Sequence, residues 1–170
     1  GCSRRQRQMC IRDRIITILG ARPQFIKAAA LSEEFQKHDS IEEIIIHTGQ
    51  HYDADMSEVF FQELGIPKPK YFLDCGGLTH GAMTGKMLES IEDILVEELP
   101  DFVLVYGDTN STLAGSIAAS KLHIPIAHVE SGLRSFNQKM PEEVNRVLTD
   151  RVSSLSVSYT HLTLPTTTSV

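Results

Sequence analysis

The stretch FVLVYGDTNSTLAGSIAASKLHIPIAHVE, residues 102–130, decides the fold. It begins with an apolar, β-branched run at 102–106, continues with small residues at 109–122, and ends with a second apolar run at 126–129. Such apolar runs predict strands that are buried on both faces, and the small residues predict a helix that packs closely on a sheet. A strand, a helix and a strand of these lengths predict a right-handed parallel crossover.

The same alternation extends along most of the chain. Pro23 suits the first turn of a helix, and Pro100 ends another helix. Strands separated by helices of this length predict an α/β fold with a Rossmann-like, doubly wound parallel sheet. The further strands are predicted at 15–19, 44–46 and 71–73, and the further helices at about 23–36, 57–64, 83–99 and 142–154.

Composition places limits on the class of protein. A chain of 170 residues with 41% hydrophobic and 22% charged residues suits one globular domain. No apolar run approaches the roughly 20 residues that span a bilayer, and no secretory signal is recognisable, so we expect a cytoplasmic protein without a membrane partner. Cys2, Cys10 and Cys75 form an odd set without paired spacing, which predicts neither a disulfide framework nor a zinc site.

The two ends differ from the middle of the chain. Residues 1–14 contain five arginines against one aspartate, and residues 156–170 are uncharged and rich in threonine. A basic arm on an acidic body could bind nucleic acid, but this arm has no periodicity and precedes a strand that needs nothing before it. We therefore expect both ends to be non-native tails around a domain at 15–155, and we expect no nucleic-acid partner.

Polar stretches follow the predicted strands and carry most of the functional information. The carboxyl ends of parallel strands share one crevice, so these stretches should bring arginines, a lysine, histidines and carboxylates together. Such a set of side chains predicts a reaction site. The stretches are GARPQFIK from Gly20, HTGQHYD from His47, YGDTNSTLAG from Tyr106, HVESGLRS from His128 and MPEEVNR from Met140.

The first two stretches predict contacts to a ligand. Arg22 and Lys27 lie around the start of a helix, where free N–H groups and the helix dipole favour an anion such as a diphosphate. The alternative is that both are solvated surface charges. Gln50 or His51 is expected to contact the substrate, whereas His47 and His51 lack a firm third ligand and predict no metal site.

Two carboxylates follow buried strands directly. Asp108 could be the N-cap of the next helix, but Thr109 and Ser111 could share that duty and leave Asp108 free. Glu130 has no helix immediately after it and has Arg134 nearby, which predicts a catalytic or ligand-orienting carboxylate.

The last stretch adds a third carboxylate, Glu142, near the start of a helix. Glu142 and Glu143 could simply stabilise the helix dipole, and Arg146 could pair with Glu142 one turn away. No GxGxxG follows the first strand, and GAMTGKM at 81–87 lacks the spacing of a phosphate-binding loop. We therefore predict no nicotinamide, flavin or other cofactor, and no ATPase.

Together these motifs resemble the N-terminal domain of the UDP-N-acetylglucosamine 2-epimerase family over residues 15–155. Within that family, HTGQHYDADMSEVFFQELGIPKP, YGDTNSTLAG and HVESGLRSFN are especially similar to enzymes that epimerise UDP-2,3-diacetamido-2,3-dideoxyglucuronate for surface polysaccharides. The resemblance implies the N-terminal half of a glycosyltransferase-B type fold, with the UDP-sugar bound between two halves. It also implies a homodimer of the full-length protein.

The resemblance implies a mechanism without a cofactor. The proton on carbon 2 of the sugar is removed as UDP leaves carbon 1, and UDP adds back after reprotonation on the other face. Asp108, Glu130 and Glu142 match the family's acid/base carboxylates, without an assignment of which is the base. The cations at 22 and 27 match its substrate-binding residues, and residues 50, 51, 134 and 146 are further candidate contacts.

Three further points limit or qualify this implication. The family's catalytic histidine lies in the second domain, so this chain alone is expected to be inactive. Gly77 and Leu78 stand where substrate-activated members have an Arg-Gln pair, which implies that the allosteric site is absent. The alternatives are a hydrolysing 2-epimerase, which releases UDP and free sugar, and half of a glycosyltransferase-B type transferase.

Overall fold

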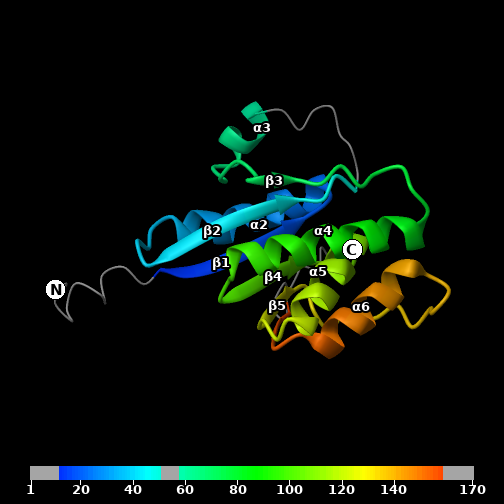
Figure 1. Cartoon of the computed structure of the whole chain (residues 1–170). Helices are drawn as coiled ribbons and strands as arrows, with labels where there is room; N and C mark the ends of the chain where they lie inside the picture. Colours follow the sequence, from blue (N-terminus) through cyan, green and yellow to red (C-terminus); the bar gives the residue numbers. More distant parts are fainter. Residues whose placement is uncertain (1–11, 51–57, 159–170) are drawn as a thin grey trace, which may run out of the picture.

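A computed structural model describes residues 12–50 and 58–158, which contain one six-stranded parallel sheet (Figure 1). The strand order is β3-β2-β1-β4-β5-β6. The strands are β1 (Asp13–Leu19), β2 (Ile41–His47), β3 (Tyr71–Phe72), β4 (Phe102–Tyr106), β5 (Ile126–Val129) and β6 (Leu155–Val157). The helices are α2 (Arg22–Phe35), α3 (Glu58–Glu63), α4 (His80–Glu98), α5 (Asn110–Lys121) and α6 (Pro141–Val152).

The predicted Rossmann-like α/β architecture is confirmed, with small shifts at the ends of elements. The sheet extends two residues beyond each predicted boundary of the domain. β1 begins at Asp13, which pairs with Ile41, and β6 ends at Val157, which pairs with Val129. β6 was not predicted, because its three residues are exposed and form no apolar run of the kind that indicates a buried strand. The non-native origin of the rest of both ends stays a prediction.

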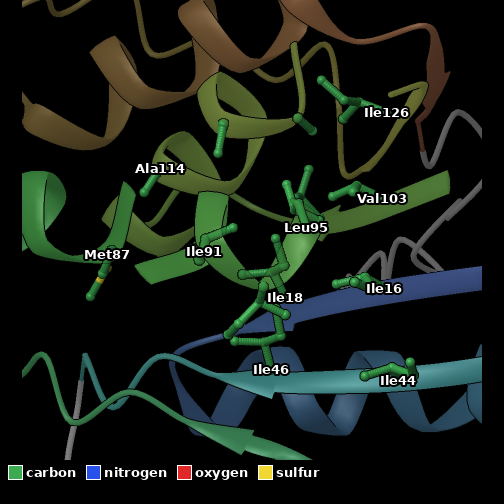
Figure 2. Packing of buried hydrophobic residues seen from close by; sticks show 14 of the residues in the cluster. Ile16, Ile18, Ile44, Ile46, Met87, Ile91, Leu95, Val103, Ala114 and Ile126 are labelled. Carbon is green, nitrogen blue, oxygen red and sulfur yellow. The ribbon is translucent and has the colours of Figure 1, made fainter. Parts of the chain in front are cut away.

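Alternating side chains of the sheet enter two separate cores. Ile16 and Ile18 of β1 face one side, together with Val103 of β4, while Leu19 faces the other. The first core packs against α4 and α5, and its side chains are seen at close range in Figure 2. The second packs against α2 and α3, with Phe25 fully buried. This period of two explains why the strands are apolar along their whole length.

The small residues of α5 allow this helix to lie close to the sheet. A Cβ atom on Gly115 would come 2.5 Å from Cδ1 of Ile18, so a larger residue would require the Ile18 side chain to shift. Ala114, Ala118 and Ala119 are likewise buried against the sheet. The close approach brings the first turn of α5 to the ends of β1 and β4.

The strand order creates a topological switch point between β1 and β4. β1 continues into α2 on one face of the sheet, and β4 continues into α5 on the other. The two loops therefore diverge at the carboxyl edge and leave a crevice, the usual ligand position in open α/β sheets. None of the helices in the described ranges is long and apolar enough to span a bilayer.

Candidate functional site

Gln24 fixes the two loops that diverge at the switch point. Its Oε1 accepts hydrogen bonds from the backbone N–H groups of Gly20 at 2.7 Å and Ala21 at 3.1 Å, at the end of β1. Its Nε2 donates to the carbonyl of Tyr106 at 2.7 Å, at the end of β4. Because Gln24 is almost fully buried, it sets the separation of the loops that carry the candidate cations and Asp108.

The structure brings Lys27 and Glu130 together. The Nζ of Lys27 lies 2.7 Å and 2.8 Å from the two carboxylate oxygens of Glu130, although 103 residues separate them. The lysine side chain is 40% exposed and that of Glu130 17%. Glu130 has a φ of 72°, which is uncommon for a residue with a side chain and marks a strained position beside the crevice.

Glu130 lies directly against the loop that carries Asp108. A Cβ atom on Gly107 would lie 3.3 Å from Oε2 of Glu130, and Gly107 itself has a φ of 66°. Both the space and the backbone conformation favour glycine at this position. The loops after β4 and β5 thus place the carboxylate of Glu130 against the residue that precedes Asp108.

Asp108 pairs with Arg146 from α6, and it does not cap α5. Thr109 is the N-cap residue, and its side chain accepts from the N–H of Thr112. Of the two alternatives left open by the sequence, the structure shows the one in which a threonine caps α5 and the carboxylate of Asp108 makes other contacts. That carboxylate forms a close ion pair with the guanidinium of Arg146, which also donates to Glu143 at 2.9 Å.

The predicted pairing of Arg146 with Glu142 is wrong. Arg146 pairs with Glu143. The carboxylate of Glu143 is buried, and it accepts hydrogen bonds from the N–H groups of Ser135 at 2.9 Å and Phe136 at 3.1 Å. These backbone donors, with the hydroxyl of Ser135 and the guanidinium, lower the pKa of Glu143 despite its burial. Glu142 is exposed at the start of α6 and contacts neither the arginine nor the other carboxylates.

Polar side chains at and after the end of β2 connect this strand to its neighbours. Oε1 of Gln50 accepts from the N–H of Ser111 at 3.0 Å and from its hydroxyl at 2.7 Å, so this oxygen anchors the first turn of α5. His47 is buried between the rings of Phe25 and Phe72. Burial lowers the pKa of His47 to about 4. The candidate contact His51 lies outside the described residues.

Arg134 does not contact Glu130. Its guanidinium lies 2.6 Å from Oδ2 of Asp150, an α6 residue that also accepts from the N–H of Gly132 at 3.0 Å. Burial alone would raise the pKa of Asp150, but these donors and His128 lower it. Arg22 is the first residue of α2 and is exposed at the carboxyl edge.

Two residues of this site were missed by sequence reasoning. Gln24 is the third residue of α2, and a glutamine there is a known signal for a hydrogen bond back to the start of the helix. Asn145 donates from Nδ2 to the carbonyl of Asp108 at 2.9 Å and to Oδ1 of Asn110 at 3.1 Å. No sequence motif indicates Asn145, because its hydrogen bonds to Asp108 and Asn110 form only when α6 packs on α5.

The expected absence of a metal site, a cofactor and an ATPase stays a prediction, and three observations bear on it. The described residues contain no group of three or more histidine, cysteine or acidic side chains that could hold a metal ion. The GAMTGKM stretch lies inside α4 and forms no phosphate-binding loop. Cys75 is fully buried, and its pKa is raised by that burial, which makes the thiol a poor nucleophile.

The arrangement combines carboxylates and cations in one partly exposed crevice. Lys27 and Arg146 each neutralise a carboxylate, and Arg22 stands at the helix start, where the backbone favours anions. Carboxylates held beside cations can accept and return protons, while the cations stabilise a departing anion. Nothing in this chemistry requires a metal or a redox cofactor.

Comparison with known proteins gives consistent matches. The family model described as UDP-N-acetylglucosamine 2-epimerase matches residues 33–163. UDP-2,3-diacetamido-2,3-dideoxy-D-glucuronate 2-epimerase of Pseudomonas aeruginosa is 65% identical over 142 residues, which are 84% of this chain and 40% of that protein. A UDP-N-acetylglucosamine 2-epimerase homolog of Methanococcus maripaludis is 63% identical over 142 residues, or 84% of this chain and 39% of that protein.

Solved structures give the same picture. The Methanocaldococcus jannaschii UDP-GlcNAc 2-epimerase in complex with UDP-GlcNAc and UDP has a TM-score of 0.79 at 54% identity, covering 83% of this chain and 39% of that one. The Neisseria meningitidis enzyme bound to UDP-GlcNAc has a TM-score of 0.79 at 36% identity, covering 85% and 39%. The chain therefore spans about 40% of the length of the proteins it matches.

Proposed function

Because the chain belongs to the UDP-N-acetylglucosamine 2-epimerase family, we propose that it forms half of the active site of a UDP-sugar 2-epimerase. The reaction inverts carbon 2 of a UDP-2-acetamido sugar by elimination of UDP and its re-addition. Residues 13–157 would supply the acid/base carboxylates and part of the diphosphate-binding surface. The rest of the site would come from the part of the relatives that this chain does not cover.

The observation that carries the proposal is the pairing of Glu130 with Lys27 and of Asp108 with Arg146 beside one crevice. The hydrogen on carbon 2 has no adjacent carbonyl to acidify it, so its removal must be assisted by departure of the diphosphate. Departure requires cations at the leaving group and carboxylates that exchange protons with carbon. The carboxyl edge supports both requirements.

The roles follow from position. Asp108 and Glu130 follow the neighbouring strands β4 and β5, and the carboxylate of Glu130 lies against Gly107, which suits proton transfer at one sugar carbon. Glu142, exposed at the start of α6, is proposed as the third carboxylate, and Arg22 as the residue that meets the diphosphate. Gln50, His51, Arg134 and Arg146 are proposed contacts to the remainder of the ligand.

UDP-2,3-diacetamido-2,3-dideoxyglucuronate is the proposed substrate, and UDP-N-acetylglucosamine is its rival. The relative named for the diacetamido sugar is 65% identical, and two relatives named for UDP-N-acetylglucosamine are 63% and 56% identical, so the order of identities favours the diacetamido sugar by a small margin. We further propose that the complete protein is a cytoplasmic homodimer, which light scattering of the complete protein would check.

The test uses a full-length chimera in which residues 13–157 replace the aligned part of the Pseudomonas aeruginosa enzyme. The chimera is incubated in deuterated water with each UDP-sugar, and carbon 2 is monitored by NMR and mass spectrometry. We expect deuterium at carbon 2, interconversion of the two epimers, and faster exchange with the diacetamido sugar. Absence of exchange with both sugars would overturn the proposal.

Product analysis separates the alternatives. Free sugar and UDP that accumulate irreversibly would identify a hydrolysing 2-epimerase. Transfer to an acceptor without deuterium exchange would identify a transferase. Acinetobacter baumannii MurG has a TM-score of 0.59 at 15% identity, and this likeness shows a shared fold alone.

A further inference from the structure

His128 is a fully buried histidine with an acceptor at each ring nitrogen. On β5, its Nε2 lies 2.7 Å from the carbonyl oxygen of Gly107, and its Nδ1 lies 2.6 Å from Oδ1 of Asp150. A carbonyl oxygen can only accept, so Nε2 must carry a proton. The protonation of the other nitrogen depends on the carboxylate that it meets.

Asp150 is held as the ionised carboxylate. Its second oxygen accepts from the N–H of Gly132 at 3.0 Å and contacts the guanidinium of Arg134 at 2.6 Å. With two donors on Oδ2, the carboxylate accepts from Nδ1 of His128 rather than donating to it. His128 therefore joins two loops, because one ring nitrogen contacts the carbonyl oxygen of Gly107 and the other contacts the carboxylate of Asp150.

This pair contacts the loops on which both candidate carboxylates stand. The carbonyl of Gly107 belongs to the peptide unit that leads into Asp108, so the hydrogen bond from His128 fixes the direction in which Asp108 leaves β4. Asn145 holds the carbonyl on the other side of Asp108. The backbone of Asp108 is thus held before and after its side chain.

The other end of the pair holds the loop after Glu130. Asp150 binds the N–H of Gly132, two residues beyond Glu130, and Gly132 has a φ of 80°. The N–H of Glu130 itself donates to the carbonyl of Val157 in β6. Glu130 keeps its left-handed backbone because residues on both sides are anchored.

We propose that His128 and Asp150 form a positioning pair that sets the spacing of Asp108 and Glu130. This proposal rests on the proposed function, because it assigns the pair to the same epimerisation. Neither residue meets the sugar. They act through the two carboxylates, whose placement within about 1 Å can change a rate about 100-fold.

The first experiment measures the exchange of histidine ring protons with solvent in the unmodified 170-residue chain by NMR with ¹⁵N-histidine labelling. We expect the Nε2 proton of His128 to exchange slowly, because it is buried and bonded to the carbonyl oxygen of Gly107, whereas the ring protons of exposed His38 and His123 should exchange rapidly. An Nε2 proton of His128 that exchanges as fast as theirs would overturn the proposal. This measurement needs no variant and no activity.

The second experiment compares Asp150→Asn and His128→Gln in the chimera with the control His38→Gln, at a temperature well below unfolding. We expect deuterium exchange to fall about 10- to 100-fold in both, with KM within about 3-fold and the control unchanged. His128→Gln, which keeps one donor for Gly107, should retain more activity than His128→Leu. Exchange above half of the unmodified rate in Asp150→Asn would contradict the proposal.

A third measurement separates this proposal from the proposed function. In the 170-residue chain, Asp150→Asn should move the backbone amide signals of Asp108 and Gly132, because both loops lose their anchor. If the unmodified chimera shows no deuterium exchange at carbon 2, the proposed epimerase activity fails, while these signals and the ring-proton exchange of His128 still decide the positioning role. Unmoved signals at both residues would overturn it.

Discussion

The two edges of the sheet use the same kind of ion pair for different purposes. At the amino edge, Glu98 accepts from Lys70 at 2.5 Å, from the hydroxyl of Tyr71, and from Arg14 at 3.2 Å. Arg14 also pairs with Glu42, which stands opposite it in the register of β1 and β2. Arg14 and Glu42 lie at the starts of β1 and β2, and Lys70 and Tyr71 lie at the start of β3. Glu98, the last residue of α4, joins these strands.

At the carboxyl edge, the pairs join loops instead. Lys27 meets Glu130 and Arg146 meets Asp108 across segments that follow β4 and β5, on a backbone that includes left-handed conformations. The amino-edge pairs fasten elements that the core already orders, whereas the carboxyl-edge pairs keep charge beside a crevice. We therefore expect mutations at the amino edge to reduce stability, and mutations at the carboxyl edge to reduce activity.

The largest expected effect is that of Glu130→Gln in the chimera. Removal of a carboxylate that transfers a proton should lower carbon-2 deuterium exchange about 1,000-fold, since general acid/base catalysis contributes about 10²- to 10⁴-fold. The unfolding midpoint should change little, because the glutamine keeps the shape of the side chain. Glu42→Gln, at the opposite edge, is the control and should exchange at the normal rate. Equal losses in the two variants would erase the distinction between the edges.

The second effect tests the amino edge. Glu98→Gln should lower the free energy of unfolding by about 2 to 3 kcal/mol, because a nearly buried carboxylate loses its charge-assisted hydrogen bonds, while the half-exposed Lys70 and Arg14 stay solvated. Urea unfolding of the 170-residue chain measures this change. Glu97→Gln, at the exposed neighbouring position, should be close to neutral. In the chimera, carbon-2 exchange by Glu98→Gln should stay normal below the unfolding transition, and a loss there would show that this edge also serves catalysis.

Sequence patterns predicted the elements well because each depends on local apolar periodicity. The runs at 102–106 and 126–129 match β4 and β5 residue for residue. The short exposed strand β6 escaped prediction, because it is defined by pairing with β5 and not by its own composition.

The site was predicted less completely, for a physical reason. Motifs identified the loops and the pairing-prone residues, but they could not say which acid meets which base. Arg146 pairs with Glu143 because the backbone N–H groups of Ser135 and Phe136 hold the carboxylate of Glu143 inward. The position of these two donors depends on the path of the loop before α6. The role of Asp150 was invisible for the same reason, since all its partners come from other segments.

A third, smaller effect shows that not every polar group at the carboxyl edge serves catalysis. His47 is neutral, and its Nδ1 accepts from the N–H of Gly49 at 2.8 Å. Burial lowers its pKa from 6.5 to about 4, so the unfolded chain takes up a proton before the folded chain does. Its contribution to stability is present above pH 6.5 and is lost as pH falls toward 4, amounting to about 2 kcal/mol at pH 5.

The check is urea unfolding at pH 8 and pH 5 for the chain and for His47→Gln. The loss of stability between these two pH values should be smaller in the variant by that amount, while His38→Gln, at an exposed position, should behave like the unmodified chain. An identical loss in His47→Gln would mean that the histidine is protonated without cost, which its buried place between two aromatic rings argues against.

The smallest expected effect is that of an exposed ion pair. It tests whether burial or ion pairing itself determines how much a pair stabilises the chain. Just beyond the end of α2, Lys37 lies 3.4 Å from Glu33 and 3.1 Å from Glu34 of that helix, and its hydrogen bond lowers the pKa of Glu34. Solvent and salt screen such pairs, so Lys37→Gln should shift the thermal midpoint of the chain by less than about 1 °C in 150 mM salt. A larger shift, of about 4 °C, would mean that an exposed pair can stabilise as much as the buried pairs of Glu98. The different effects expected at the two edges would then be due to ion pairing itself. The position of a pair, in the core or beside the crevice, would no longer explain them.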